Sequence, residues 1–325
     1  MFFKNKKILV TGGAGFIGTN LINRLLEKEA LIKATVHMKE PVIKDKRIDY
    51  IKCDLTKLGD CVGVVKDIDY IFHCAANTSG AAVIEKTPLV HLTPNVVMNA
   101  YFLEAAYQAG VEKFLWLSSS TGYPPTGSRP VKEEEMMIGD PYEKYFCVGW
   151  MKRYTEVLCK IYAQKVKNPM TTIVLRPTNI YGEYDDFNFE TSHVFAALTR
   201  RVLERQNPLE VWGTGEDIRD LIYAGDFIQA MLLAMERVDE YDVFNIGSGG
   251  GVSIKELLNI MLEVGYYKNA DIRFDPSKPT TIPVRLVDTT KAETILGFKA
   301  KVSLRKGIEK TFKWYRDNKS VINEG

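Results

Sequence analysis

An α/β fold with a doubly wound parallel sheet and a smaller α/β C-terminal lobe is predicted by three features of the sequence. Short apolar runs alternate with helical patterns over the first 120 residues, a glycine-rich turn follows the first apolar run, and the pattern changes after Pro169. Strands that alternate with helices of this length imply right-handed crossovers and a parallel sheet. We therefore expect one domain at residues 1–175 and a second lobe at 176–325, with segments near 220–250 returning to the first domain.

The expected elements follow one another along the chain. Apolar runs typical of buried strands lie at residues 6–11, 32–38, 48–56, 69–76 and 112–120, and the stretch 18–29 has the spacing of a helix. In the second lobe we expect a strand at 171–182, a helix over roughly 191–206, a strand, glycine turn and helix within 242–262, and a closing amphipathic helix. The sequence contains no internal repeat and no low-complexity linker.

Composition limits the classes of function. The 325 residues are 46% hydrophobic, and 43 basic side chains nearly balance 41 acidic ones, which leaves a net charge of +2 and no basic tract suited to nucleic acid. Five cysteines without C-x-x-C spacing and four scattered histidines predict no metal site. Because no signal-peptide core and no apolar run of about 18 residues occur, we expect a cytoplasmic protein without a membrane or nucleic-acid partner.

A glycine-rich turn, VTGGAGFIGTN, connects the first predicted strand to the first predicted helix. Its glycines are three residues apart, and the same stretch also matches G-x-G-x-x-G. Glycine lets the backbone approach a pyrophosphate closely, and the helix that follows presents unpaired N–H groups and a positive dipole end. The turn therefore predicts a Rossmann-type dinucleotide site. The cofactor-binding residues expected here are Gly12, Gly15, Phe16, Ile17 and Gly18.

The end of the second predicted strand decides between NAD and NADP. An acidic residue there binds a free ribose 2′-hydroxyl, whereas a basic residue favours a 2′-phosphate. His37 and Lys39 stand where an acid is expected, and Glu40 follows one residue later. The charge slightly favours NADP, and NAD remains the alternative. Asp54, followed by Leu55, ends the third predicted strand, where its carboxylate could bond the adenine amino group or cap a turn.

Several motifs resemble those of the extended short-chain dehydrogenase/reductases. The glycine turn is joined by FHCAA at 72–76, LSSSTGYP at 117–124 and RPTNIYG at 176–182. In the second lobe, DDFNFETSHVFAALTRR and VWGTGEDIRDLIYAGD make the chain most similar to the nucleotide-sugar epimerase/dehydratases, and among them to the GDP-fucose synthase and GDP-mannose 3,5-epimerase groups. The resemblance implies an NAD(P)-binding Rossmann domain at 1–175 and a nucleotide-sugar-binding lobe at 176–325.

The resemblance implies catalytic roles for three residues. Ser119 matches the serine that hydrogen-bonds the sugar oxygen undergoing redox. Thr121 stands where the fucose synthases place a cysteine that helps to invert ring carbons, and His193 matches the histidine that works with that cysteine. Further positions implied by the resemblance are Ser120 for the substrate and Ala75, Lys152 and Pro177 for the cofactor.

The resemblance also implies contacts to the substrate's diphosphate or nucleotide. Asn179, Arg219 and Arg285 fall at these positions. Arginine suits the role because its planar fork donates two hydrogen bonds to a phosphate. For Arg219 the sequence leaves an alternative, an ordinary surface ion pair with the neighbouring Asp220.

Lys152 lies in the stretch KYFCVGWMKRYTE, residues 144–156, and matches a family lysine that a proton-transferring tyrosine normally precedes by four residues. That position is Val148 here. A second alignment equates Tyr145 with the family tyrosine and leaves Gly149 in place of the lysine, but the ungapped match of KRYTEVLCKIY favours the first. On one continuous helix Tyr145 would lie about 10.5 Å from Lys152 along the axis and lean away from it. A helix that starts after Tyr145 would remove this argument.

The leading interpretation is an NAD(P)-dependent epimerase, reductase or dehydrogenase that transfers hydride at a carbon, by the resemblance C4, of a nucleotide-activated sugar, with a GDP-sugar favoured. Its proton route then passes through Ser119, Thr121, the displaced Tyr145 or water. The alternative is a catalytically silent protein that binds a dinucleotide or nucleotide sugar, which Val148 and Thr121 favour. The resemblance further implies a homodimer built from an apolar helix near 95–109 and the helix that bears the family lysine.

Overall fold

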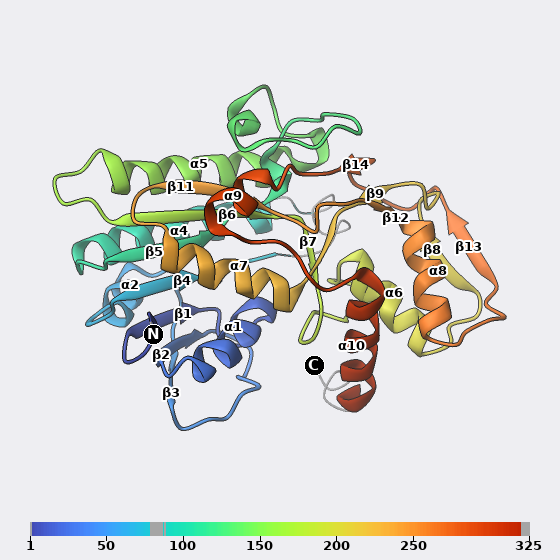
Figure 1. Ribbon diagram of the computed structural model, residues 1–325, viewed down its shortest axis with the longest axis horizontal. Helices are drawn as coiled ribbons and strands as arrows, with labels where there is room; N and C mark the ends of the chain where they lie inside the picture. Colours follow the sequence, from blue (N-terminus) through green and yellow to red (C-terminus); the bar gives the residue numbers. More distant parts are fainter. Residues whose placement is uncertain (1, 79–86, 88, 320–325) are drawn as a thin grey trace.

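A computed structural model gives the structure of the chain and describes residues 2–78, 87 and 89–319. Its centre is a sheet of seven parallel strands in the order β11-β6-β5-β4-β1-β2-β3. These strands are β1 (Lys7–Thr11), β2 (Leu31–Val36), β3 (Ile48–Lys52), β4 (Tyr70–His73), β5 (Lys113–Leu117), β6 (Thr171–Pro177) and β11 (Asp242–Ile246). Helices cover both faces of the sheet, which confirms the predicted doubly wound α/β fold (Figure 1).

Because both faces are covered, the strands are buried on both sides and their side chains alternate between two cores. In β5, Leu115 belongs to one core, whereas Phe114 and Trp116 belong to the other. The helices of the first core are α1 (Phe16–Glu27) and α7 (Ala224–Arg237), and those of the second are α2 (Leu58–Val64), α4 (Leu89–Gln108) and α5 (Phe146–Gln164).

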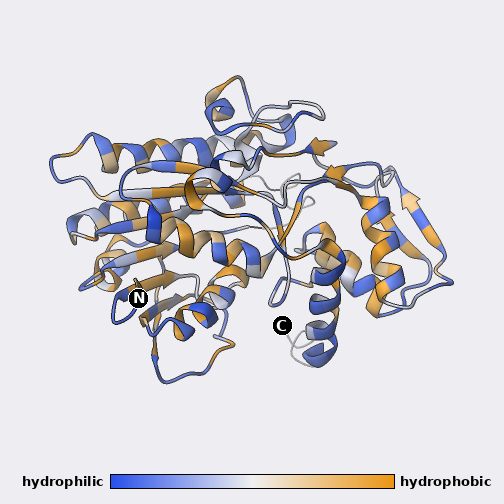
Figure 2. Cartoon of the chain, in the orientation of Figure 1, coloured by the Kyte–Doolittle hydropathy of each residue, from blue (hydrophilic) through white to orange (hydrophobic). Residues whose placement is uncertain are grey.

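The second lobe lies at one end of the sheet and has a hydrophobic core of its own (Figure 1). Its elements are α6 (Val194–Leu203), β8 (Leu209–Trp212), β9 (Ile218–Arg219), β12 (Val252–Ser253), α8 (Ile254–Val264), β13 (Ile272–Asp275), β14 (Val284–Arg285) and α10 (Leu304–Asp317). The predicted closing helix is α10, which buries Ile308, Phe312 and Tyr315 at helical spacing and is otherwise mostly polar (Figure 2).

The strand expected at 171–182 is in fact two strands. Strand β6 ends at Pro177, and β7 (Asn179–Tyr181) leaves the central sheet to pair with β10 (Leu221–Tyr223). The break falls at Thr178, whose N–H still donates to Ile246 O, whereas the next N–H, of Asn179, donates to Asp220 O. The chain therefore passes from the first sheet to the second lobe within one residue.

Later segments of the chain return to the first domain. Strand β11 pairs with β6 from Asp242 opposite Ile173 to Ile246 opposite Pro177, and becomes the seventh strand of the sheet. Helix α9 (Thr290–Leu296) then packs against β11 and contributes Leu296 to the core shared with α1 and α7.

Several helix boundaries differ from the expected ones. The helix expected near 95–109 begins earlier, at Leu89, and the one expected over 191–206 is limited to α6. Three short 3-10 turns lie on the loops at the carboxyl side of β5, namely η1 (Ser120–Gly122), η2 (Glu133–Met137) and η3 (Glu143–Tyr145). In the described part of the chain, no helix is both long and apolar enough to cross a lipid bilayer.

Candidate active site

The turn between β1 and α1, Gly12–Gly18, forms a cradle that fits a dinucleotide pyrophosphate. Gly12 has a φ of +67°, and a Cβ there would lie 3.0 Å from Ala75 Cα. A Cβ on Gly18 would lie 2.2 Å from Gly12 O, so glycine alone lets α1 pack against the turn. Gly15 caps α1 without a side-chain bond, and the first turn of α1 contains no acidic residue. The first N–H groups of this helix are therefore available to an anion.

A buried polar network supports the cradle. Ala75 N–H donates to Thr11 Oγ1 at 2.9 Å, and Thr11 Oγ1 lies 2.7 Å from His73 Nδ1. Burial lowers the pKa of His73 to about 4, so the neutral ring accepts from Thr11 at Nδ1 and donates from Nε2 to Asn99 Oδ1 at 3.0 Å. Asn99 donates in turn to Thr155 Oγ1 at 3.2 Å, which connects the cradle to α4 and α5. Sequence reasoning missed this network, whose one visible sign was the histidine of FHCAA.

The residues expected at the adenosine end of the cofactor follow the neighbouring strands β2 and β3. His37 and Lys39 are exposed just past the end of β2. Asp54 Oδ1 accepts from Thr56 N at 3.0 Å and from Thr56 Oγ1 at 2.7 Å. These bonds, and to a smaller extent the charge of His37, lower the pKa of Asp54. Asp54 therefore caps its own turn, as one of the two alternatives for it proposed, and the neighbouring Leu55 is buried.

The serines that follow β5 point in different directions. Ser119 Oγ accepts from Thr121 N at 3.2 Å and is half-buried, so its own O–H remains available to a ligand. Ser118 points the other way and donates to Glu156 Oε1 at 2.5 Å. Ser120 is buried within η1. The Thr121 hydroxyl is buried and has no hydrogen-bond partner among the described residues, which marks it as a group open to an incoming polar atom.

Lys152 reaches from α5 to the carboxyl end of β5. Its Nζ donates to Leu117 O at 2.8 Å and lies 4.7 Å from the centroid of the Trp116 ring. The side chain is almost completely buried, and this burial lowers the pKa of Lys152 to about 8, although the charge of Glu156 acts in the opposite direction. Glu156 is not the direct partner of Lys152, because its carboxylate is paired with Arg176.

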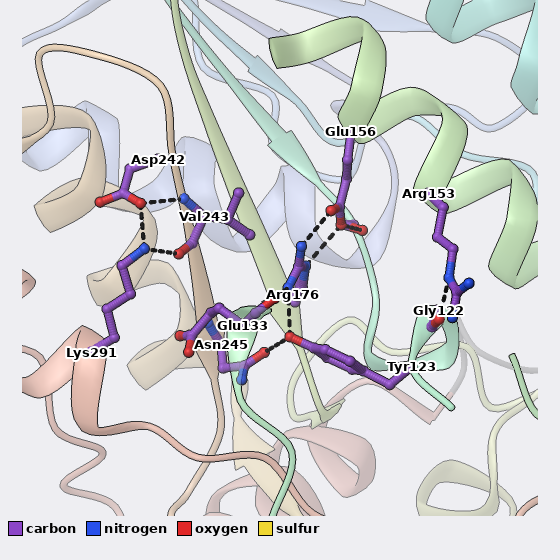
Figure 3. A network of polar contacts seen from close by, with 11 residues as sticks. Gly122, Tyr123, Glu133, Arg153, Glu156, Arg176, Asp242, Val243, Asn245 and Lys291 are labelled. Carbon is purple, nitrogen blue, oxygen red and sulfur yellow. Dashed lines mark hydrogen bonds and ion pairs between the residues drawn. The ribbon is translucent and has the colours of Figure 1, made fainter. Parts of the chain in front are cut away.

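The pair between Glu156 and Arg176 is the centre of a buried network (Figure 3). Arg176 donates from Nε to Glu156 Oε1 at 2.9 Å and from Nη2 to Oε2 at 2.5 Å. Its Nη1 donates to the Tyr123 hydroxyl at 2.7 Å, and that hydroxyl donates to Asn245 Oδ1 at 2.6 Å. Burial raises the pKa of Tyr123. The phenol of Tyr123 is thus fully used in linking β6 to β11, a role that sequence reasoning did not assign.

The structure places Tyr145 outside the helix that bears Lys152. Tyr145 is the last residue of η3, and α5 begins at Phe146, so the distance along a single helix does not apply to it. Its ring is buried and packs edge-on to Tyr142 at 6.0 Å. A Cβ on Gly149 would lie 2.6 Å from a side-chain atom of Pro141, so no lysine fits there. This steric limit supports the alignment that uses Lys152.

The two predicted substrate arginines lie opposite each other, because β9 and β14 pair in parallel with Arg219 facing Arg285. Arg219 is buried and pairs with Asp217 at 3.2 Å, so the alternative of a surface ion pair with Asp220 is wrong. Asp220 instead accepts from Ser248, both from its N–H and from its hydroxyl.

Arg285 is a buried cation without a carboxylate partner among the described residues. It donates to Pro124 O and to Tyr123 O, each at 3.1 Å, and its Nε is buried without a partner in the part of the chain that the structure describes. Burial lowers the pKa of Arg285 to about 10, and the nearby charge of Arg219 contributes in the same direction. Because Arg219 is paired with Asp217, the guanidinium of Arg285 is the main source of positive potential beside the loop that bears Ser119.

The other predicted residues of the second lobe gather on the segment after β7. His193 is the N-cap of α6 and makes no cap bond through its side chain. His193 is exposed. Desolvation by the surrounding protein nevertheless lowers the pKa of His193, whereas the nearby charge of Asp186 raises it. Asn179 is half-buried at the start of β7. Sequence reasoning missed Asp185, whose Oδ2 is buried without a partner in the described part of the chain and whose pKa is raised to about 8 by burial.

Residues 8–247 match the family described as the NAD dependent epimerase/dehydratase family. The chain is 30% identical over 321 residues to a GDP-L-fucose synthase of Sinorhizobium fredii, with 96% of each chain covered. It is 27% identical over 325 residues to a dTDP-4-dehydro-6-deoxy-D-allose reductase of a Streptomyces species, with 97% of each covered.

Among solved structures, UDP-glucose 4-epimerase from Thermotoga maritima with UDP-glucose is similar, with a TM-score of 0.86 and 28% identity over 96% of this chain and 99% of that one. The matched residues contain the glycine cradle, the loop after β5 and the whole helix of Lys152. A nicotinamide dinucleotide is accordingly the cofactor of this chain. The chain belongs to the NAD-dependent epimerase/dehydratase family.

Proposed function

We propose that the protein transfers hydride at a carbon, C4, of a nucleotide-activated sugar, and that a GDP-sugar is its preferred substrate. The observation that carries this proposal is the buried guanidinium of Arg285, which lacks a carboxylate partner among the described residues. Its hydrogen bonds go to the carbonyls of Tyr123 and Pro124, in the same loop as Ser119. A buried cation is costly without an anion, and the diphosphate of a nucleotide sugar would supply one next to the redox serine.

The residues of the chain have distinct tasks in this reaction. The bound cofactor supplies or accepts the hydride. Ser119 Oγ is oriented by Thr121 N and donates its hydrogen to the reacting sugar oxygen. Lys152 uses one N–H on Leu117 O, so two remain for the nicotinamide ribose and the site around it. Arg219 and Arg285 hold the diphosphate.

The test is a search for hydride transfer and for new products. The purified protein is incubated with reduced and oxidised NAD and NADP and a panel of GDP-, dTDP- and UDP-sugars, including 4-keto forms. Nicotinamide absorbance follows net redox, and chromatography detects epimers that form without net redox. We expect turnover with a GDP-sugar, and its complete absence with every sugar tested would contradict the proposal.

NADP is the proposed cofactor because His37 and Lys39 are exposed past the end of β2, where a 2′-phosphate would lie. We expect Lys39→Glu to weaken NADPH binding about tenfold relative to NADH, because one charge-assisted contact contributes about 1.5–3 kcal/mol. Fluorescence titration measures both dissociation constants. Lys46→Glu, another exposed lysine of the following loop, is the control. A wild-type preference for NADH would contradict this assignment.

The second candidate is a protein that binds a dinucleotide or nucleotide sugar without chemistry. One observation favours it: position 148 carries no phenol, and the hydroxyl of Tyr123 is held between Arg176 and Asn245. Tight binding of both ligands in the absence of any product would favour this candidate.

We also propose a cytoplasmic homodimer. All five cysteines are free thiols, as expected in a reducing compartment. Along α5, apolar side chains that are exposed in the single chain recur at helical spacing, and α4, which packs against α5, carries the exposed Tyr101. A second copy of the chain would cover this face. The α5 residues are Phe146, Trp150, Tyr154, Val157 and Ile161.

A further inference from the structure

The proposed hydride transfer needs a proton donor, and the structure narrows the choice. A carbonyl oxygen whose carbon accepts hydride must gain a proton at the same time. Near the carboxyl end of β5, the phenol of Tyr123 and both ring nitrogens of His73 are already used in buried hydrogen bonds. Tyr145 and Lys152 therefore remain as the candidate proton donors at this end of the sheet.

Lys152 is a buried ammonium group with spare hydrogens and, among the described residues, without a direct counter-ion. One N–H is used on Leu117 O, and in the described part of the chain no carboxylate lies within ion-pair distance of Nζ. Glu156, one turn away, is fully occupied by Arg176 and Ser118. A charge held in this way is relieved when its proton leaves, so the amine is suited to giving up a proton.

The surroundings of Lys152 place it at the reacting end of the site. Its hydrogen bond to Leu117 O fixes Nζ two residues before Ser119, the serine expected to hold the sugar oxygen. Val148, one helical turn before Lys152 on the same side of α5, is aliphatic and cannot exchange a proton. Tyr145 lies outside α5, packs against Tyr142 and is close enough to Arg285 to interact with its charge.

We propose that Lys152 itself, rather than a tyrosine, exchanges the proton with the sugar oxygen in this enzyme. In the reducing direction the carbonyl carbon takes a hydride, with reduced nicotinamide as its source, and the electron pair of the C–O π bond moves to oxygen. That oxygen forms a bond to one proton of the Lys152 ammonium, which leaves a neutral amine that regains a proton from water. In the oxidising direction the neutral amine accepts the hydroxyl proton. The inference rests on the proposed function.

The first test separates charge from proton transfer at position 152. Lys152→Arg keeps a cation that can hold the cofactor ribose, but a guanidinium does not release its proton near neutral pH. We expect the single-turnover rate of hydride transfer to fall about 10²- to 10⁴-fold while the cofactor dissociation constant changes less than about threefold. Tyr145→Phe is the competing variant. A larger loss of rate in Tyr145→Phe than in Lys152→Arg would overturn the inference.

A second variant asks whether a phenol can replace the amine. Val148→Tyr, combined with Lys152→Arg, puts a hydroxyl one turn before a permanent positive charge. We expect the double variant to transfer hydride at least about tenfold faster than Lys152→Arg alone, since general acid help contributes about 10²-fold or more. No gain in the double variant, with cofactor binding intact, would count against Lys152 as the group that was replaced.

The third measurement does not depend on activity. Carbon-13 NMR of protein labelled at lysine Cε, without any ligand, follows the ionisation of each lysine, and Lys152→Met identifies the signal. We expect the Lys152 signal to titrate near pH 8, and the reductive rate to fall as pH rises through the same value. An amine that keeps its proton above about pH 10, the ordinary range for lysine, would overturn the inference. If no sugar is turned over, the proposed function is contradicted, and this measurement still tests separately whether Lys152 can release its proton.

Discussion

The glycines of the cradle are important because they carry no side chain. Gly15 has only hydrogen where a Cβ would lie 3.2 Å from Gly12 O, at the point where α1 meets the pyrophosphate. We expect Gly15→Val to weaken binding of NADPH by about tenfold to a hundredfold, because charged hydrogen bonds to the phosphates contribute about 1.5–3 kcal/mol. Isothermal titration calorimetry measures the effect. Gly63→Ala is the matched control, since a Cβ on Gly63 meets nothing within 4 Å, and unchanged affinity in Gly15→Val would contradict the cradle.

A residue-scale prediction also follows for pH. The pKa of His73 is lowered to about 4 by burial, so between about pH 6.5 and pH 4 the unfolded chain binds a proton there and the folded chain does not. The free energy of unfolding therefore falls as pH decreases through this window, by up to about 3 kcal/mol for this group. We expect His73→Gln to be less stable than wild type at pH 7 but to lose less stability between pH 7 and pH 5. Urea titrations at both pH values check this, and equal losses would refute it.

The boundary between η3 and α5 explains why the sequence did not show whether Tyr145 belongs to the helix that bears Lys152. Helix α5 begins at Phe146 and brings Gly149 against Pro141, and its next turn carries Lys152 to the end of β5. A pattern of apolar residues does not reveal that η3 interrupts the helix just before Phe146. Whether Tyr145 belonged to the helix was therefore undecided until the structure showed the backbone.

The ion pair between Glu156 and Arg176 joins α5 to β6, and we expect it to contribute strongly to the free energy of unfolding. Its side chains are 1% and 4% exposed. We expect Glu156→Gln to reduce the free energy of unfolding by about 3–5 kcal/mol, because it leaves the guanidinium buried without a counter-charge. Chemical denaturation measures the change. Glu263→Gln, in the exposed pair with Arg305, is the control and should cost at most about 1 kcal/mol; similar effects of both variants would contradict the prediction.

At the scale of the whole molecule, the exposed apolar face of α5 is the surface most in need of a partner. Tyr154, in the middle of this face, is 49% exposed. If two copies pack there, Tyr154→Glu buries a charge at the interface, and we expect it to shift a dimer toward monomer. Sedimentation equilibrium at micromolar protein measures the mass. The control variant is Ile295→Glu, which changes an equally exposed apolar residue on α9. A monomeric wild-type protein would contradict the dimer.

Much of the first domain followed from local sequence alone. The alternation of apolar runs and helical patterns predicted the parallel sheet, since strand and helix periods are properties of neighbouring residues. The cradle was equally visible, because Gly12 and Gly18 are demanded by the turn itself and by the helix that starts within it. The prediction of a single strand over 171–182 was wrong at Thr178, where the chain changes sheet. The residues on both sides of Thr178 have the pattern of a strand, so the sequence does not show the break.

Contacts between distant segments were decided only by the tertiary structure. Arg219 and Arg285 face each other because β9 pairs with β14, and no local pattern shows that, among the described residues, only Arg219 is paired with a carboxylate. Likewise, Glu156 lies one helical turn from Lys152 in the sequence. In the fold, however, the Glu156 carboxylate pairs with Arg176, and the buried amine of Lys152 donates to a backbone carbonyl. Periodicity fixes which way a side chain points along its own element, whereas its charge state depends on the groups that folding brings around it.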